Sequence, residues 1–250
     1  MVRALLVRGM LVGILAGLLT FGFLKVYGEP QVDLAISFET QMDIARQAAE
    51  KAKGMAVEEE PELVSRQVQA GLGLFTAVMV YCTAFGGLFG LAFAFAYGRV
   101  PGMIAPQAVS VMLAAAGFIA IYLVPNLKYP ANPPSVGDPQ TIGMRTALYF
   151  LMIAVSVAAM IGAIVLRRLL IGRFGDWNAS FIVAAYYIVI VAIAAFLLPA
   201  VNEVPVEFPA VVLWKFRVAS IGAQFILWAT LGLVFGVLTE RASARTAQRA

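Results

Sequence analysis

Residues 145–199 read RTALYFLMIAVSVAAMIGAIVL, then RRLLIGRFGDWN, then ASFIVAAYYIVIVAIAAFLLP: two long apolar runs separated by a short basic segment. Each run has the roughly 20 apolar residues that an α-helix needs to cross the hydrocarbon core of a bilayer. Because the runs are continuous and do not alternate polar with apolar residues, helices are favoured over the strands of a membrane barrel. This stretch therefore predicts two transmembrane helices joined by a short loop over residues 167–178.

The same arrangement recurs along the whole chain. Of the 250 residues, 62% are hydrophobic and 13% are charged, whereas soluble domains carry about 25% charged residues. We therefore expect an all-α membrane protein, a single polytopic domain over residues 1–250 with six transmembrane helices in three hairpins. The predicted spans are residues 4–26, 70–97, 103–125, 145–166, 179–199 and 216–238.

Proline and arginine mark alternate junctions between these spans. Prolines close the first, third and fifth apolar runs, and arginines open the second, fourth and sixth: Pro30, Pro125 and Pro199; Arg66, Arg145 and Arg217. Because the connections of a helical bundle alternate between its two faces, the three proline-to-arginine connections must share one face. That face, called the outer face below, carries most of the acidic residues.

The connections on the opposite face carry arginine as their only basic residue and only two acids, Asp176 and Glu240. This density of positive charge near the span ends favours cytoplasmic N- and C-termini, and we expect the cell (inner) membrane. An arginine-rich face also suits contact with anionic lipid headgroups. Binding of nucleic acid is not expected, because the basic residues are scattered among span ends and form no single stripe. These arginines are Arg3, Arg8, Arg99, Arg167, Arg168, Arg173, Arg241, Arg245 and Arg249.

The first outer connection contains a further periodic segment. Apolar residues recur every three or four positions from Leu34 to Ala52, with charged residues between them. The pattern predicts an amphipathic helix over residues 31–53 that lies on the outer surface or packs over the bundle, and that ends at Gly54.

Three glycines form a stripe on the first span: Gly9, Gly13 and Gly17. Four-residue spacing places them on one helix face, where another backbone can approach closely. The stripe predicts either helix packing within the bundle or a contact surface for a homo-oligomer or partner subunit. Similar pairs occur in the second and sixth spans: Gly86 and Gly90, Gly232 and Gly236.

The residue inventory excludes several kinds of chemistry. The chain has no histidine and one cysteine, Cys82, which removes the commonest transition-metal ligand and histidine-based catalysis. No Walker A motif and no charged residue near a span centre are present. We expect neither an enzyme nor a permanently bound cofactor.

Oxygen ligands instead gather in the outer connections. Carboxylate and amide oxygens suit hard or borderline divalent cations. The candidate metal-binding residues are Glu29, Asn126, Asp138, Asn202 and Glu203, of which Glu29, Asp138 and Glu203 are preferred. The alternative is structural: Asp138 caps a helix, and Glu29 or Glu203 pairs with Arg145 or Arg217.

Residues 125–146, PNLKYPANPPSVGDPQTIGMRT, resemble the CbtA family of probable cobalt transporter subunits. The resemblance extends over nearly the whole chain, through Gly28-Glu29-Pro30, Leu198–Glu203 with Phe208-Pro209, and Trp214–Arg217. It implies a multi-pass component of cobalamin-related uptake of cobalt(II). It also implies a small partner, CbtB, with one span and a histidine-bearing tail that could lend the ligands missing here.

Two other functions fit the same residues. A structural or assembly subunit of a larger membrane complex agrees with the glycine stripe and with the absence of buried charge. A carrier for an organic solute would use aromatic residues within the spans, namely Tyr81, Tyr186 and Tyr187, although packing or interfacial anchoring also explains them.

Overall fold

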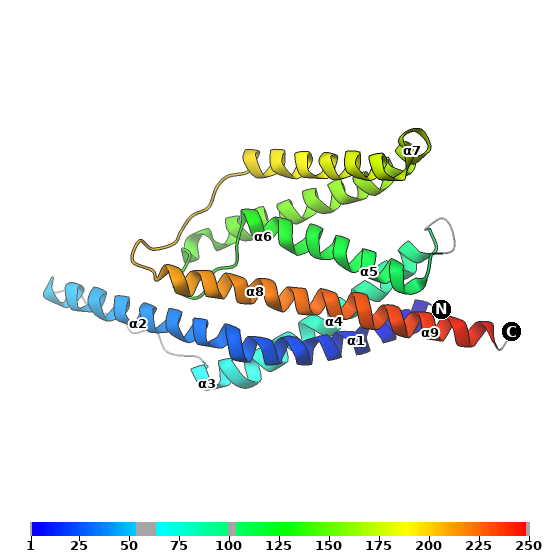
Figure 1. The fold of residues 1–250 in the computed structure, drawn as a ribbon. Coiled ribbons are helices and arrows are strands. Elements are labelled where there is room, and N and C mark those ends of the chain that lie inside the picture. The colour runs from blue at the N-terminus through cyan, green and yellow to red at the C-terminus, as the bar shows by residue number, and fades with distance from the viewer. Residues whose placement is uncertain (1, 54–63, 100–103, 249–250) are drawn as a thin grey trace. The chain divides into compact units, whose positions relative to one another are not determined.

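The computed structural model describes residues 2–53, 64–99 and 104–248, and the regular elements in these ranges are all helical (Figure 1). The α-helices are α1 (Val2–Phe23), α2 (Glu29–Ala52), α3 (Arg66–Val68), α4 (Leu74–Tyr97), α5 (Pro106–Gly117), α6 (Val124–Lys128), α7 (Ile142–Leu197), α8 (Ala210–Thr230) and α9 (Gly236–Ala247). Between them lie four π-helical turns, η1 (Leu24–Gly28), η2 (Gln69–Gly73), η3 (Phe118–Leu123) and η5 (Leu231–Phe235), and one 3-10 turn, η4 (Pro139–Thr141).

Within the described residues, five helical stretches are long and apolar enough to cross a membrane. The predicted all-helical fold with several apolar helices of spanning length is confirmed. Two predicted spans, 145–166 and 179–199, fall in one stretch, and the predicted start of another, residue 103, lies outside the described residues. The five stretches are Val2–Ala52, Arg66–Tyr97, Pro106–Lys128, Pro139–Leu197 and Ala210–Arg245.

Helix α7 turns back on itself at Gly175, where the backbone has φ 73° and ψ 172° (Figure 1). Its two arms pack against each other. The Ser156 and Tyr187 hydroxyls are hydrogen-bonded at 2.7 Å, and a Cβ on Gly162 would lie 2.7 Å from Tyr186 Oη. The predicted loop over residues 167–178 is wrong, because one glycine with positive φ reverses the chain while its neighbours stay helical.

Two of the three prolines predicted to end helices do not do so. Pro30 and Pro125 are each the second residue of a helix, and a π-helical turn, η1 or η3, precedes each helix directly. A proline at this position lacks an N–H that the preceding turn would otherwise bond, and the wider π-turn redirects the axis without breaking it. Only Pro199 lies beyond the end of its helix.

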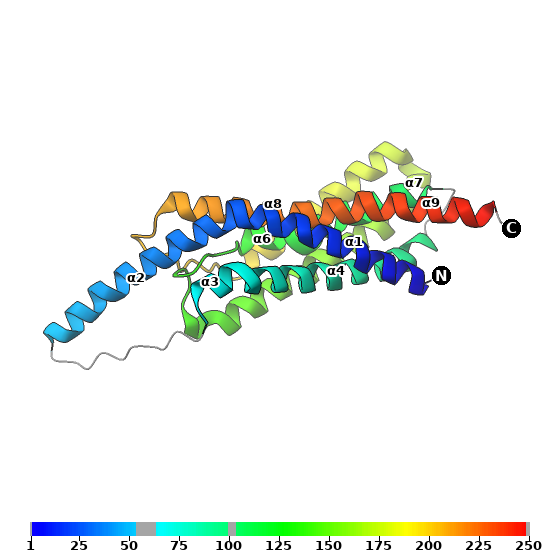
Figure 2. The same cartoon turned by 90° about the horizontal axis from the view of Figure 1, so that it is seen from below.

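The amphipathic helix is present as α2, Glu29–Ala52, close to the predicted range 31–53. It continues α1 through η1 and does not form a separate surface helix, and Gly54 lies outside the described residues. Only the base of α2 is packed: Ala35 is fully buried and the Phe38 ring lies 5.1 Å from that of Phe208. The rest extends beyond the ends of α4 and α8 (Figure 2).

The chain forms two compact units. Unit 1 comprises residues 1–115, 132–136 and 205–250, and unit 2 comprises residues 116–131 and 137–204. Unit 1 holds α1–α4, most of α5, α8 and α9, while unit 2 holds the end of α5, η3, α6, η4 and the α7 hairpin. The predicted outer connections are therefore split between the two units, so that each unit contains some of the residues predicted to lie on the outer face.

The glycine stripe of α1 packs against α4 inside unit 1. A Cβ on Gly9 would lie 2.1 Å from Gly86 O, and one on Gly13 would lie 2.3 Å from Cys82 O. The predicted packing within the bundle therefore accounts for the stripe, and an oligomer contact through the same face would have to displace α4. An aromatic cluster completes this core, with Phe235 in edge contact with Phe89 at 5.4 Å and Phe93 at 5.1 Å.

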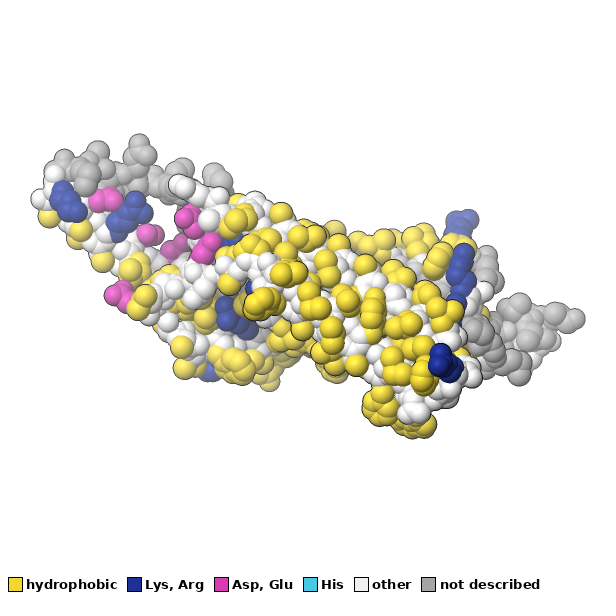
Figure 3. Space-filling model, turned by 90° about the horizontal axis from the view of Figure 1, so that it is seen from above, with side chains coloured by type: hydrophobic (Ala, Val, Ile, Leu, Met, Phe, Trp, Pro, Cys, Tyr) yellow, Lys and Arg dark blue, Asp and Glu magenta, His cyan; other side chains and the backbone are white. Residues whose placement is uncertain are grey.

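The exposed surface has the polarity that a membrane protein requires. Many large apolar side chains of α1, α4 and α7 face outward, among them Leu11, Phe95 and Phe181. On the face drawn in Figure 3, apolar side chains cover most of the described surface and charged side chains are few.

Candidate functional site

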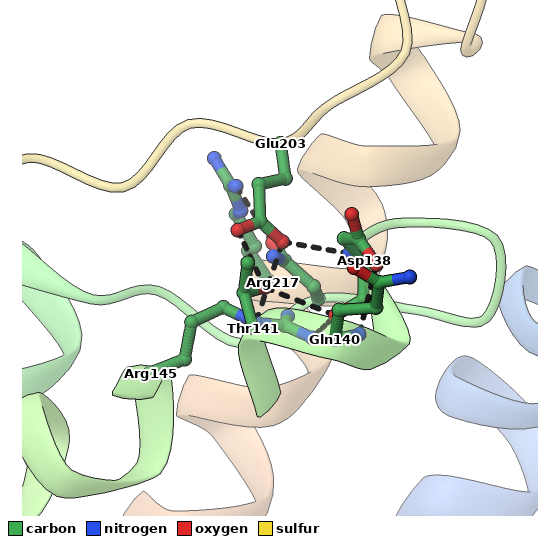
Figure 4. A network of polar contacts seen from close by, with 7 residues as sticks. Asp138, Gln140, Thr141, Arg145, Glu203 and Arg217 are labelled. Atoms are coloured by element: carbon green, nitrogen blue, oxygen red, sulfur yellow. Dashed lines mark hydrogen bonds and ion pairs between the residues drawn. The ribbon is translucent and has the colours of Figure 1, made fainter. Parts of the chain in front are cut away.

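In unit 2, three groups hold the carboxylate of Glu203 (Figure 4). The backbone N–H of Asp138 donates to Oε2 at 2.7 Å, and the Thr141 hydroxyl donates to Oε1 at 2.7 Å. Arg145 Nε lies 3.3 Å from Oε2, an ion-pair distance without hydrogen-bond alignment. The segment after α7 is therefore fastened to the start of α7 by a single carboxylate.

Local sequence explains why these groups converge. Asp138 has an extended backbone and caps η4, with its Oδ1 accepting from Gln140 N at 2.8 Å. Pro139 follows as the first residue of that turn, a position at which no N–H is required. Arg145, one turn into α7, donates from Nη2 to the carbonyl of Asp138 at 3.0 Å. The turn thus presents Asp138, Thr141 and Arg145 to one point.

Gly137 makes room for this arrangement. Its φ of +124° is strained for any residue with a side chain, and a Cβ there would lie 2.2 Å from Arg145 Nη1. The guanidinium can lie against the turn only because position 137 has no side chain.

The environment of Glu203 favours its charged form. The Thr141 hydroxyl, then the Asp138 N–H and then the positive charge of Arg145 lower the pKa of Glu203 below its ordinary value. The carboxylate is therefore ionised at neutral pH. Glu203 lies beside the exposed residue Asp138, and Arg145 is an ion-pair partner of its carboxylate.

Unit 1 has an acid–arginine cluster of its own. Arg66, at the start of α3, pairs with Glu29 at 2.5 Å and with Asp33 at 2.9 Å. Glu29 is buried, with 9% of its surface exposed, whereas the Asp33 side chain is 61% exposed. These contacts tie the base of α2 to the start of the next span.

Part of the proline-rich connection also belongs to unit 1. Arg217 donates to Asn132 Oδ1 at 2.9 Å, and the Ser135 hydroxyl donates to the carbonyl of Ala35 at 3.0 Å. Pro133 and Val136 are buried. The segment Asn132–Val136 is thus held by α2 and α8 through specific contacts, while its neighbours on both sides belong to unit 2.

The structure brings together two of the five predicted ligands, Asp138 and Glu203. Asn126 is buried and its Oδ1 accepts from Ala131 N at 3.1 Å, which gives it a structural contact within the connection. Asn202 is exposed, and Glu29 belongs to unit 1. Among the described residues, no group of three His, Cys, Asp or Glu side chains could hold a metal ion.

Both structural alternatives occur beside these ligands. Asp138 caps a turn, and Glu203 pairs with Arg145 as expected, while Glu29 pairs with Arg66. Thr141 is absent from the residues predicted from the sequence, although its position three residues after a capping Asp is a usable signal. A divalent cation here would need the two carboxylates together with hydroxyl, carbonyl or water oxygens.

The three tyrosines considered for an organic solute fall in different units. In unit 1, Tyr81 lines a pocket of about 400 Å³ with Thr20, Cys82 and Gln224, and Gln224 Nε2 lies 3.3 Å from the Tyr81 hydroxyl. In unit 2, Tyr186 and Tyr187 pack the arms of the α7 hairpin. The three residues therefore form no common solute pocket within either unit.

The family model described as probable cobalt transporter subunit (CbtA) matches residues 2–240 of this chain, which is nearly its whole length. No curated protein and no solved structure matches the chain significantly.

Proposed function

Because the chain belongs to the CbtA family of probable cobalt transporter subunits, we propose that it is the multi-pass subunit of an inner-membrane system for uptake of cobalt(II). The observation that carries this proposal is the family match over residues 2–240, together with apolar helices of spanning length.

We propose six spans with both termini cytoplasmic. Helix α7 has 56 residues, and an unbroken helix of that length would extend roughly 84 Å, far beyond a hydrocarbon core of about 30 Å. The reversal at Gly175 divides it into two arms of spanning length. Together with the other four apolar stretches, these arms make an even number of crossings, so the two termini would share the arginine-rich side.

The site that would receive the ion is the pair Asp138 and Glu203, with Thr141 beside them. Two carboxylates and neighbouring neutral oxygens suit a hydrated divalent cation bound weakly. Arg145 would act as a resident counter-ion, displaced when the cation binds and restored when it leaves. Weak binding of this kind fits a transporter, since a tightly held ion would not be released.

Glu29, Asn126 and Asn202 are further proposed contributors at the outer face. Glu29, like Glu203, has an arginine partner, here Arg66, so it could exchange one cation for another. A small single-span partner of the CbtB kind would supply nitrogen ligands, since this chain has no histidine.

The test is cobalt accumulation in cells lacking the native gene and complemented with variants. Glu203→Gln is expected to lower accumulation severalfold, and Glu29→Gln with Glu203→Gln to lower it further, at unchanged abundance in the membrane. Glu207→Gln is the matched control, because Glu207 is an exposed carboxylate in the same connection as Glu203. Equal accumulation by the wild type and the double variant would reject this site while leaving family membership intact.

A structural or assembly role is the second candidate. It is favoured by the arginine partners of Glu29 and Glu203, which give these carboxylates a structural function without any ion. A deletion strain with normal cobalt uptake, in which the chain co-purifies with a stoichiometric large partner, would support it against the transport proposal.

A further inference from the structure

A groove of about 760 Å³ lies between the first turns of α1 and the last turns of α9, both in unit 1. The two helix ends lie at the same end of the unit in Figures 1 and 2. Four arginines and five apolar side chains form its walls, and none of the lining residues is acidic: Arg3, Ala4, Val7, Arg8, Leu11, Leu238, Arg241, Ala242 and Arg245.

The positive charge in this groove is not neutralised within the described part of the chain. None of its four arginines takes part in an ion pair there. Arg8 donates to the Thr239 hydroxyl at 3.0 Å, which fixes α1 to α9 but adds no negative charge. The nearby acid on α9, Glu240, instead accepts from the backbone N–H of Gln107 at 3.3 Å.

Other arginines on the predicted cytoplasmic face have partners within the chain. Arg167 pairs with Asp176, while Arg99 lies 3.8 Å from the centre of the Phe95 ring and Arg173 lies 5.4 Å from that of Phe174. An orienting role in the membrane requires only that arginines be near span ends. It does not explain why four converge on one groove without a counter-ion.

Apolar residues lie one helical turn away from three of these arginines. On α1, Val7 is four residues after Arg3 and Leu11 is three residues after Arg8; on α9, Leu238 is three residues before Arg241. These spacings place each apolar side chain one turn from an arginine on the same helix face and toward the middle of the span. The apolar side chains are open to the surroundings, with exposed fractions of 46% for Val7, 61% for Leu11 and 41% for Leu238.

We propose that this groove binds an anionic phospholipid. The guanidinium groups bind the phosphate, for which their planar donors are suited, and the apolar side chains contact the part of an acyl chain nearest the headgroup. A free phosphate or an acidic peptide would use the arginines alone, whereas a phospholipid matches both halves of the groove. The proposal does not depend on which ion the protein transports.

The test measures lipid-dependent thermal stabilisation of the full chain purified in a neutral detergent. Dioleoyl phosphatidylglycerol is expected to raise the Tm, while dioleoyl phosphatidylcholine and inorganic phosphate at the same concentrations do not. In Arg241→Gln with Arg245→Gln, the lipid concentration needed for half the effect should rise roughly 25-fold, from about fivefold per arginine. The charge-retaining pair Arg241→Lys with Arg245→Lys should recover most of the response.

Arg168→Gln with Arg173→Gln is the matched control, since it removes the same charge from unit 2 and should respond as the wild type does. Equal weakening by both glutamine pairs would overturn the proposal in favour of diffuse charge attraction. A Tm increase of equal size with phosphatidylcholine would reject recognition of the headgroup. The same increase with inorganic phosphate would reject the lipid and identify a simple anion site.

Discussion

Gly137 carries a larger structural role than its size suggests. Its positive φ starts the turn that presents Asp138 and Thr141 to Glu203, and its missing side chain leaves space for the Arg145 guanidinium. A substitution at Gly137 would therefore disturb the candidate ion site without removing a ligand atom or a charge. The effect of the turn's conformation on stability can thus be measured separately from the effect of charge.

Gly137→Ala is expected to lower the free energy of unfolding by about 1–3 kcal/mol, because alanine is strained at this φ and its Cβ meets Arg145 Nη1. The measurement is chemical or thermal unfolding of the purified chain followed by circular dichroism. Gly143→Ala is the control, since a Cβ at Gly143 has no neighbour within 4 Å. Equal stability of the two variants would contradict the packing of Arg145 on Gly137.

Thr141 is the largest cause of the lowered pKa of Glu203. A carboxylate whose pKa is lower in the folded state stabilises the fold above its unfolded pKa, and this contribution is lost as pH falls through the folded pKa. Thr141→Val should therefore lower the Tm at neutral pH, with the difference from the wild type shrinking as pH falls from about 6 to about 3. Thr146→Val, a substitution in the following helix α7, should show no such trend. A Tm difference independent of pH would assign the effect of Thr141 to packing.

The candidate site was only partly predictable from residue types. Asp138 and Glu203 could be named because carboxylates beside prolines at span ends are few. That these two residues lie next to each other could not be predicted, because it depends on the path of an irregular segment of the chain and on the hydroxyl of Thr141. The partner of Glu29 could not be predicted for a related reason: Arg66 and Arg145 have the same sequence context, and only the fold decides which one pairs with Glu29.

At the scale of helices, close packing between α1 and α4 follows from glycines on both. Gly9 and Gly13 face Gly86 and Cys82 backbone atoms, and a Cβ on Gly90 would lie 2.5 Å from the carbonyl oxygen of Leu5. Small residues at such crossings let backbones approach in a bilayer, where no hydrophobic force drives association. The spacing of four residues was a sufficient signal for a packed helix face, although not for its partner.

Gly9→Ala is expected to destabilise the chain by about 1–3 kcal/mol, because the added Cβ would lie 2.1 Å from Gly86 O. The buried thiol of Cys82, 1% exposed, offers a direct readout through its reaction with a fluorogenic maleimide on heating. Gly22→Ala, on the same helix, has no neighbour within 4 Å and should leave the reaction temperature unchanged or slightly higher. A larger effect of Gly22→Ala would contradict this α1–α4 contact.

The clearest errors of the sequence-based predictions also concern the helices. The expectation that proline ends a helix fails at Pro30 and Pro125, since each follows a π-helical turn and the helix goes on. Periodicity still identified α2, because amphipathic spacing survives a local change of hydrogen bonding. The sequence did not single out Gly175 as the point of reversal. Glycine is common in transmembrane helices, and only its backbone angles distinguish a chain reversal from a position of close helix packing.

For the whole molecule, composition together with the continuous apolar runs predicted the all-helical membrane class, but the predicted number of crossings depends on the α7 hairpin. Its second arm, residues 176–197, separates Arg173 from Glu207, and an arm of this length crosses about 30 Å. In a Cys82→Ala background, Glu207→Cys should therefore react with a membrane-impermeant maleimide on intact cells, and Arg173→Cys only after permeabilisation. Reaction of both on intact cells would mean that the second arm does not cross, and the reverse pattern would place the N- and C-termini outside. The reverse pattern would also place Asp138 and Glu203 on the side opposite to the one from which an imported cation arrives, so labelling of Arg173→Cys and Glu207→Cys bears on the transport proposal as well as on the fold.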